Sequence, residues 1–219
     1  MLHLTHVLLL FSVSAKTLLA ADFVDLVTFD KCGSDKTCGW SLENDPVMGG
    51  QSHSSWTVDP SSGVAHWVGE VKDVPSLKAP GFCWTKTSNY YLHPVFPDAS
   101  PFTHLLMRVK SAEAYSAWKV SFAADTINPQ FASFKADFSV ATGDWTTVAI
   151  PWDNFSNKWS STTGEPTKSC KDDSSVCPTT KNLRDIKQIG IWAEGKAGSF
   201  DIEILWIRAG NSTVQHATI

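Results

Sequence analysis

The sequence predicts an all-β protein, folded as one β-sandwich of two antiparallel sheets, and three observations support this prediction. Short segments alternate apolar and polar residues, which is the pattern of strands with one buried face. Clusters of turn-forming residues separate these segments. No segment has the periodicity of a long amphipathic helix, and the 219 residues are enough for a single sandwich domain.

The first predicted strands form a hairpin around a turn at residues 60–63, which contains proline and glycine. Its two arms are residues 54–59 and 64–71. Later strands are expected wherever the alternation returns, at residues 105–110, 118–123, 134–140, 145–150 and 199–208. The strand at 145–150 ends before a proline, which cannot donate a ladder hydrogen bond.

The pattern changes along the last predicted strand. One face is apolar throughout, and we expect this face to point into the core. Its residues are Phe200, Ile202, Ile204 and Trp206. The opposite face begins with the acids Asp201 and Glu203 and becomes apolar at Leu205 and Ile207. One end of that second face is therefore expected to be exposed and the other end buried.

A long polar segment, residues 156–182, lies between two predicted strands. It is rich in Ser, Thr, Lys and Asp, the composition of an exposed loop. A loop of this length inside a compact domain indicates either disorder or a functional edge. Residues 182–189, which follow, have room for one helical turn.

Residues 40–52 combine turn-forming residues with apolar anchors. Asn and Asp side chains bond nearby backbone amides, the following proline restricts the chain, and two glycines supply backbone freedom. The motif residues are Asn44, Asp45, Met48, Gly49, Gly50 and Ser52. We expect a structural corner that leads into a strand; a loop shaped to hold a ligand or partner is the alternative.

Several motifs, in order along the chain, resemble those of the complex I intermediate-associated protein family. The first is the segment 44–52, and the others are Gly69, Gly81-Phe82, and the segments 105–109, 145–155, 189–191 and 198–207. Together they cover residues 40–209. The resemblance implies a galactose-binding-like jelly-roll β-sandwich. For the founding members of the family it implies an assembly-factor role in mitochondria.

The amino terminus indicates export rather than a mitochondrial address. Residues 7–13 form an apolar block that is too short to span a bilayer, and small residues follow it. We therefore predict that residues 1–20 are a signal peptide and that residues 21–219 form the single mature domain. The first arginine is Arg108, which argues against a transit peptide. We expect a secreted protein without stable membrane insertion; a retained anchor or a short buried helix is the alternative.

Cysteine usage agrees with export. Cys32 lies close to Cys38, and Cys170 close to Cys177, each pair in polar sequence typical of exposed connections, so two disulfides are predicted. Zinc binding is the alternative, but neither pair has the short C-x-x-C spacing. The remaining Cys83 lies in an apolar run and is expected to be buried; a reactive nucleophile is its alternative role.

Two glycosylation sequons fit the same pathway. Asn154 is followed by Phe-Ser, and Asn211 by Ser-Thr. Such sites are modified only when the chain enters the secretory pathway. We therefore expect a glycoprotein.

Several charged residues lie between apolar neighbours on predicted strands and should point away from the core. The candidate ligand-binding residues are Arg108, Lys119, Lys135, Asp137 and Glu203 together with Trp84 and Trp192, and further aromatic candidates are Tyr90, Tyr91 and Trp159. Charged groups bond sugar hydroxyls while an aromatic ring stacks on the sugar, so this face predicts glycan recognition. The alternative is the exposed face of any half-buried antiparallel sheet.

Catalytic and nucleotide-binding signatures are missing from the sequence. It contains no G-x-S-x-G, H-E-x-x-H, P-loop or dinucleotide motif. Asp137 and Glu203 are the acids that a glycosidase would use. A formal net charge of −4 and scattered Lys and Arg argue against a nucleic-acid partner. We predict a non-catalytic protein that needs no cofactor.

A structural calcium site is suggested by analogy with other galactose-binding-like domains. Many domains of the galactose-binding-like group hold a structural calcium between the first and last strands, and calcium prefers oxygen ligands. Here the oxygens would come from Asp22, Asp25, Asp30 and Asp201. None of these residues belongs to a calcium-binding loop signature.

The sequence therefore predicts a secreted, non-catalytic binding or assembly module that recognises a glycan or glycoprotein through a polar sheet face. The first alternative is an assembly factor or chaperone that acts on a protein partner. A carbohydrate-active enzyme is the more distant alternative. The sequence does not fix the oligomeric state.

Overall fold

The computed structural model describes residues 22–45, 49–87, 96–124 and 133–211. The predicted signal peptide, Met48, Tyr90 and Tyr91 lie outside these ranges. Within the described ranges, no helix is long and apolar enough to cross a membrane.

The described chain is built mainly from strands, with one short α-helix and two 3₁₀ turns. In chain order the elements are β1 (Phe23–Thr28), β2 (Trp40–Asn44), β3 (His53–Asp59), β4 (Val64–Val71), β5 (Asp73–Val74), β6 (Ala79–Pro80), β7 (Phe82–Thr87), β8 (His104–Ser111), β9 (Trp118–Ala124), β10 (Ser133–Phe138), β11 (Thr146–Pro151), η2 (Trp152–Asn154), η3 (Ser174–Val176), α1 (Thr180–Arg184), β12 (Ile186–Glu194) and β13 (Gly198–Gly210). The strands predicted from alternation are all present.

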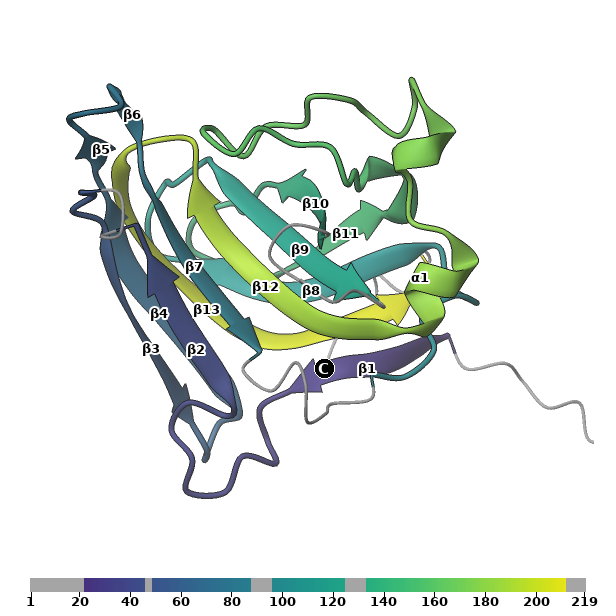
Figure 1. Cartoon of the computed structure of the whole chain (residues 1–219). Helices are drawn as coiled ribbons and strands as arrows, with labels where there is room; N and C mark the ends of the chain where they lie inside the picture. The colour runs from purple at the N-terminus through teal and green to yellow at the C-terminus, as the bar shows by residue number, and fades with distance from the viewer. Residues whose placement is uncertain (1–21, 46–48, 88–95, 125–132, 212–219) are drawn as a thin grey trace, which may run out of the picture.

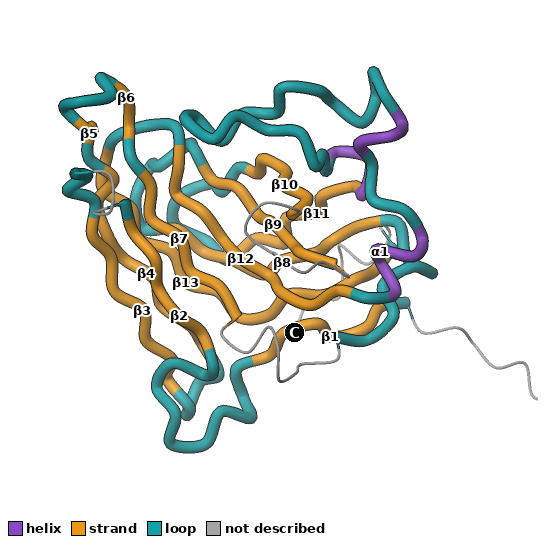
Figure 2. The backbone as a smooth tube through the Cα atoms, in the orientation of Figure 1, coloured by secondary structure: helices purple, strands orange, loops and turns teal. Residues whose placement is uncertain are grey.

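Two antiparallel sheets stack face to face (Figures 1 and 2). The six-stranded sheet has the order β11-β8-β13-β4-β3, with β1 also paired to β13. The five-stranded sheet has the order β10-β9-β12-β7-β2. Strands β5 and β6 form a separate small ribbon. The predicted jelly-roll β-sandwich is confirmed.

Aromatic residues from both sheets fill the space between them. Trp67 on β4 lies 4.7 Å from Phe200 on β13, and Trp118 on β9 lies 5.5 Å from Phe200, measured between ring centroids. All three side chains are almost completely buried. Ring pairs at these distances contribute about 0.5–1.5 kcal/mol beyond the burial of their apolar area.

Strands β1, β2, β5, β6, β7 and β12 were not among the strands expected from alternation, and β12 shows one reason. Every residue of β9 is buried, and so are eight of the nine positions of β12. A strand covered on both faces can carry apolar residues on both, as β12 does, and then it lacks the alternation of a half-exposed strand; β9 keeps the alternation through Lys119 and Ser121. The five-stranded sheet is therefore covered on its outer face as well as on its core face.

A β-bulge corrects the prediction for β13. The pairing of β13 with β8 shifts register between Ile204 and Trp206. Beyond the shift Ile207 is completely buried, whereas Trp206 is partly exposed. The expectation that Trp206 continues the core face is wrong, because one extra residue inverts the alternation, whereas Ile207 is buried as expected for that end of the strand.

The polar segment before α1 is packed, so the disorder expected as one alternative is wrong. Residues 156–178, here called the covering loop, lie beside β9 and β10 (Figure 1). Isolated bridges join Ser156 to Lys135 and Trp159 to Pro166. The helical turn begins at Thr180 with a capping box, and residues 186–189 are already strand, so the turn lies earlier than predicted.

Candidate functional site

Asp45 is the centre of the motif at residues 44–52. Its buried carboxylate accepts hydrogen bonds from the backbone N–H of Ser52 at 3.1 Å, from Ser52 Oγ at 2.7 Å and from the backbone N–H of Phe82 at 3.1 Å. A Cβ at Gly81 would lie 1.4 Å from Asp45 Oδ2, and one at Gly50 would lie 2.1 Å from Oδ1. These glycines leave room for the carboxylate, which gives the motif a structural role.

The other described residues of this motif fit the same role. Asn44 accepts a hydrogen bond from Ser54 Oγ at 3.0 Å, which ties β2 to β3. Gly49 has a φ of +74°, a conformation that other residues rarely adopt. The structural corner expected from the sequence therefore has direct support from these contacts.

Two further glycines of the family motifs also make room for large side chains. A Cβ at Gly190 would lie 2.3 Å from Trp84 Nε1, because the indole packs onto that position of β12. A Cβ at Gly69 would lie 2.7 Å from the Phe200 ring. At both positions the missing side chain lets an aromatic ring of the sandwich pack against the backbone.

The predicted ligand-binding residues do not share one face. Lys119, Lys135 and Asp137 lie on β9 and β10, and Trp84 and Trp192 lie on β7 and β12, all in the five-stranded sheet. Arg108 and Glu203 lie on β8 and β13 in the six-stranded sheet. Alternation identified outward positions correctly but not the layer to which each strand belongs. The single polar face expected from the sequence is therefore two faces.

Lys119 is almost completely buried at the outer face of the five-stranded sheet. Its Nζ lies 2.7 Å from Asp137 Oδ1 and 2.8 Å from Glu165 Oε1 of the covering loop. Burial by itself would lower the pKa of Lys119, but hydrogen bonds to the two carboxylates outweigh it and raise the pKa.

Lys135 is buried beside it, between two tryptophans. Its Nζ lies 2.7 Å from Glu194 Oε2 and 3.9 Å from the ring centroids of both Trp159 and Trp192. Burial lowers the pKa of Lys135, and Glu194 opposes this shift. Gly164 of the covering loop packs against Glu194 so closely that a Cβ would lie 2.0 Å from Oε2. The expectation that Lys119 and Lys135 line an open face is wrong, because Glu165 and Trp159 of the covering loop lie against them and both side chains are buried.

Trp84 and Trp192 stack on each other at 4.1 Å between ring centroids and are only 3% and 6% exposed. Trp192 Nε1 donates to Ser121 Oγ at 2.8 Å. Lys86 Nζ lies 3.7 Å above the Trp84 ring and 2.5 Å from Glu43 Oε2. Both faces of this stack are occupied by protein, so the pair is not an open platform for a sugar ring.

Both predicted disulfides are present, Cys32–Cys38 and Cys170–Cys177. The second disulfide lies within the covering loop. Cys83 is free and completely buried. Burial raises the pKa of its thiol to about 12, which argues against the nucleophile role.

The two candidate acids of the enzyme alternative lie in different layers. Asp137 is bound to Lys119 on the five-stranded sheet. Glu203 lies on the six-stranded sheet, 3.4 Å from Lys110 Nζ. Glycoside hydrolysis needs two carboxyl groups on opposite sides of one bond, and these two do not meet this requirement.

Among the four aspartates considered for calcium, Asp201 lies far along β13 from Asp25. Asp25 bonds to Arg208 and Asp201 to His66. Because Arg208 is paired with Asp25 and is seven residues from Asp201 along β13, the Cα atoms of Asp25 and Asp201 are about 23 Å apart. Among the residues that the structure describes, no group of three or more His, Cys, Asp or Glu is placed to hold a metal ion.

The outer face of the six-stranded sheet carries the open polar pleat. Glu203 and Lys110 form a half-exposed pair, and His66 Nε2 lies 2.8 Å from Asp201 Oδ1 with side chains 43% and 30% exposed. Arg108, which donates to Thr147 Oγ1 at 3.2 Å, continues this pleat. Charged donors and acceptors are thus fixed in place while still reaching solvent.

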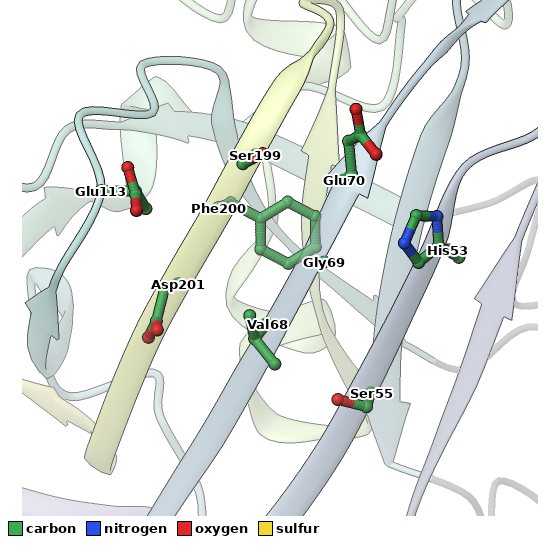
Figure 3. A pocket seen from close by; sticks show the side chains of 9 residues that line it. All are labelled: His53, Ser55, Val68, Gly69, Glu70, Glu113, Ser199, Phe200 and Asp201. Carbon is green, nitrogen blue, oxygen red and sulfur yellow. The ribbon is translucent and has the colours of Figure 1, made fainter.

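A groove of about 360 Å³ opens at one end of this pleat. Side chains of His53, Glu70 and Asp201 rise into it from the adjacent strands β3, β4 and β13 (Figure 3). Ser55 and Ser199 add hydroxyl groups to its walls. No such groove was predicted, since its residues come together only through the pairing of three strands.

A second hollow, of about 230 Å³, lies at the other end of β13. Trp206, Arg208, Asp25, Asp30 and Ser62 are among its walls. Along β13 the nearest wall residues of the two hollows are Asp201 and Leu205, whose Cα atoms are about 13 Å apart. Both belong to the same outer face.

Comparison with known sequences identifies the family. Residues 28–204 match the sequence pattern of the family described as Complex I intermediate-associated protein 30. The chain belongs to this family. This match confirms the family resemblance that the sequence motifs indicated. It covers most of the residues that the structure describes. Comparison with curated proteins gives no match.

Solved structures of the same fold include carbohydrate-binding modules. A family 11 carbohydrate-binding module from Clostridium thermocellum, in complex with a β-1,3-1,4-mixed-linked tetrasaccharide, has 16% sequence identity and a TM-score of 0.52. The similarity covers 89% of this member of the Complex I intermediate-associated protein 30 family and 97% of that chain. The family 11 module of a cellulosomal cellulase of the same organism has 17% identity, a TM-score of 0.55, and coverage of 91% and 100%. These similarities show a shared fold.

Proposed function

We propose that this protein is a non-catalytic module that binds a glycan through the outer face of its six-stranded sheet. The observation that carries the proposal is the open pleat along β13, where paired charged groups remain half-exposed and a groove of about 360 Å³ opens beside them. The other sheet face is not available, because the covering loop and its ion pairs occupy it.

The chemistry of the pleat suits sugar hydroxyls. A hydroxyl both donates and accepts, and so it is best held by a carboxylate next to a cationic or imidazole group. Asp201 beside His66 and Glu203 beside Lys110 provide two such pairs. The named ligand of one structural neighbour, a mixed-linked tetrasaccharide, supports a saccharide as the ligand class.

The proposal is tested by binding measurements on the full mature chain. We expect a saturable signal on a glycan array, confirmed by calorimetry, and a loss of at least tenfold in affinity in Asp201→Asn and Glu203→Gln. Asp98→Asn is the matched control, since Asp98 lies outside the pleat in an exposed loop. An array without any binding, or equal losses in all three variants, contradicts the proposal.

Secretion is part of the same proposal. Two disulfides are typical of oxidising compartments. Asn154 is exposed at the end of η2, so its sequon is accessible to glycosylation. Expression of the full chain in secreting cells should release the protein into the medium. The mass of the released protein should be lower in Asn154→Gln than in the wild type, because one glycan is lost. A protein that stays inside the cell without a glycan argues against secretion.

A protein partner is the second candidate function. Val68 is 36% exposed in the floor of the groove, between charged side chains. An apolar floor with a charged rim also suits a peptide segment. Crosslinked pull-downs from secreting cells should capture a partner that Val68→Asp loses, and a solitary protein in this experiment removes this candidate.

A further inference from the structure

The hollow at the end of β13 contains a tryptophan that the fold turns outward. The β-bulge at Leu205 inverts the alternation, so that Trp206 lies on the outer face while Ile207 enters the core. A tryptophan that stays partly exposed contributes less hydrophobic stabilisation than one that points into the core. The bulge therefore places an aromatic ring at the end of the open pleat.

Arg208 is held rigidly beside this ring. Its guanidinium carbon lies 4.2 Å from the ring centroids of both Phe23 and Trp206. Its Nε is 2.5 Å from Asp25 Oδ1. The remaining guanidinium nitrogens have no hydrogen-bond partner among the described residues, so they are available as fixed donors.

Acceptors complete the hollow. Asp30 lies in its wall, and a hydrogen bond from the Thr28 side chain lowers the pKa of Asp30, so its carboxylate stays ionised. Ser62, from the turn between β3 and β4, adds a hydroxyl. An aromatic ring, fixed donors and ionised acceptors are the groups that hold a pyranose ring and its hydroxyls.

The charges around both hollows restrict the ligand. Asp25 and Asp30 outnumber Arg208 in the hollow at Trp206. In the groove at the opposite end, Glu70, Glu113 and Asp201 line the walls; Lys72 pairs with Glu70 at 3.4 Å, and the three acids outnumber this cation. Uronic or sulfated sugars would meet like charges at both ends.

We propose that the hollow at Trp206 is a subsite for one ring of a neutral oligosaccharide, with Arg208 and Asp30 binding its hydroxyls. This inference rests on the proposed glycan-binding function and adds a subsite and a ligand class to it. A neutral chain that follows β13 would reach from Trp206 to the groove at Asp201 over about 17 Å.

The test is an NMR titration of the folded mature protein, labelled at the indole nitrogens. The probes are a β-1,3-1,4-mixed-linked glucan tetrasaccharide and, as the acidic counterpart, an α-1,4-galacturonan tetrasaccharide. The Trp206 resonance is assigned as the one that disappears in Trp206→Phe. We expect the neutral probe to shift this resonance and the acidic probe to bind at least tenfold more weakly.

Variants separate the subsite from the rest of the pleat. Trp206→Ala and Arg208→Lys should each lower the affinity for the neutral probe about tenfold. Trp145→Ala, at another partly exposed tryptophan, should leave this affinity unchanged. Thermal unfolding confirms that each variant is folded. If the neutral probe binds without moving the Trp206 resonance, the subsite is wrong but the proposed function stands. Tighter binding of the acidic probe overturns the ligand class, and absence of binding to both probes overturns the inference.

Discussion

Gly81 lies where any side chain would collide with the carboxylate of Asp45, since a Cβ there would be 1.4 Å from Oδ2. The Asp45 carboxylate in turn holds the start of β7 through the N–H of Phe82. Two family motifs that are far apart in the sequence are thus parts of one structural unit. In this chain the glycines of both motifs therefore make room for one buried carboxylate.

Replacement of Gly81 tests this unit. In Gly81→Ala the added methyl group must displace a buried, hydrogen-bonded carboxylate, so we expect a loss of about 3 kcal/mol in the free energy of unfolding. Gly33→Ala is the control: its φ is +58°, but nothing lies within 4 Å of the added Cβ, and about 1 kcal/mol is expected. Urea unfolding measures both, and equal losses would contradict the steric explanation.

The buried ion pair beneath the covering loop should be costly to break from one side. Lys135→Met leaves Glu194 charged and buried, so we expect a loss of about 3–5 kcal/mol. The double variant Lys135→Met/Glu194→Leu should recover most of this loss. Lys168→Met, which breaks an exposed pair with Asp173, should cost about 0–1 kcal/mol. A loss in Lys135→Met no larger than in Lys168→Met would show that the loop does not depend on the buried pair.

Lys119 should make stability depend on alkaline pH. Its pKa is raised in the folded protein, so its contribution is complete below the unfolded value of 10.5 and is lost as the pH rises through the higher folded value. In Lys119→Met the free energy of unfolding should therefore fall less steeply above pH 10.5 than in the wild type. Denaturant unfolding across this range measures the slopes, with Lys168→Met as the exposed-lysine comparison. An unchanged slope in Lys119→Met would contradict the direction of the shift.

Cys83 should be unreactive in the folded protein. A thiol pKa of about 12, against an ordinary 9.0, leaves about a thousandfold less thiolate at neutral pH, and the side chain is also buried. Iodoacetamide should leave the native chain unmodified and label one site after unfolding in denaturant without reductant. Rapid labelling of the native protein, read by mass spectrometry, would reopen the nucleophile role.

The sequence predicted the sandwich because half-exposed strands such as β3, β4 and β8 keep a clear alternation. It did not predict β12, whose two faces are both covered. The bulge at Leu205 was equally hidden, because alternation alone assumes a regular register.

The candidate site was harder to predict than the fold. Lys119 looked like an exposed strand residue, and only folding shows that Glu165, 46 residues away, binds it. The covering loop has the composition of an exposed loop, although its Gly164 and Val176 are buried. The groove of Figure 3 depends on the pairing of β4 with β13, two strands that are far apart in the chain.

The central claim is that a glycan binds the outer face of the six-stranded sheet. The most direct test is a map of backbone amide chemical-shift changes when the β-1,3-1,4-mixed-linked glucan tetrasaccharide is titrated into the folded protein. The account predicts that the largest changes cluster on β4, β8 and β13, along the outer face of the six-stranded sheet. Changes confined to β7, β9 and β12, on the face beneath the covering loop, would contradict it.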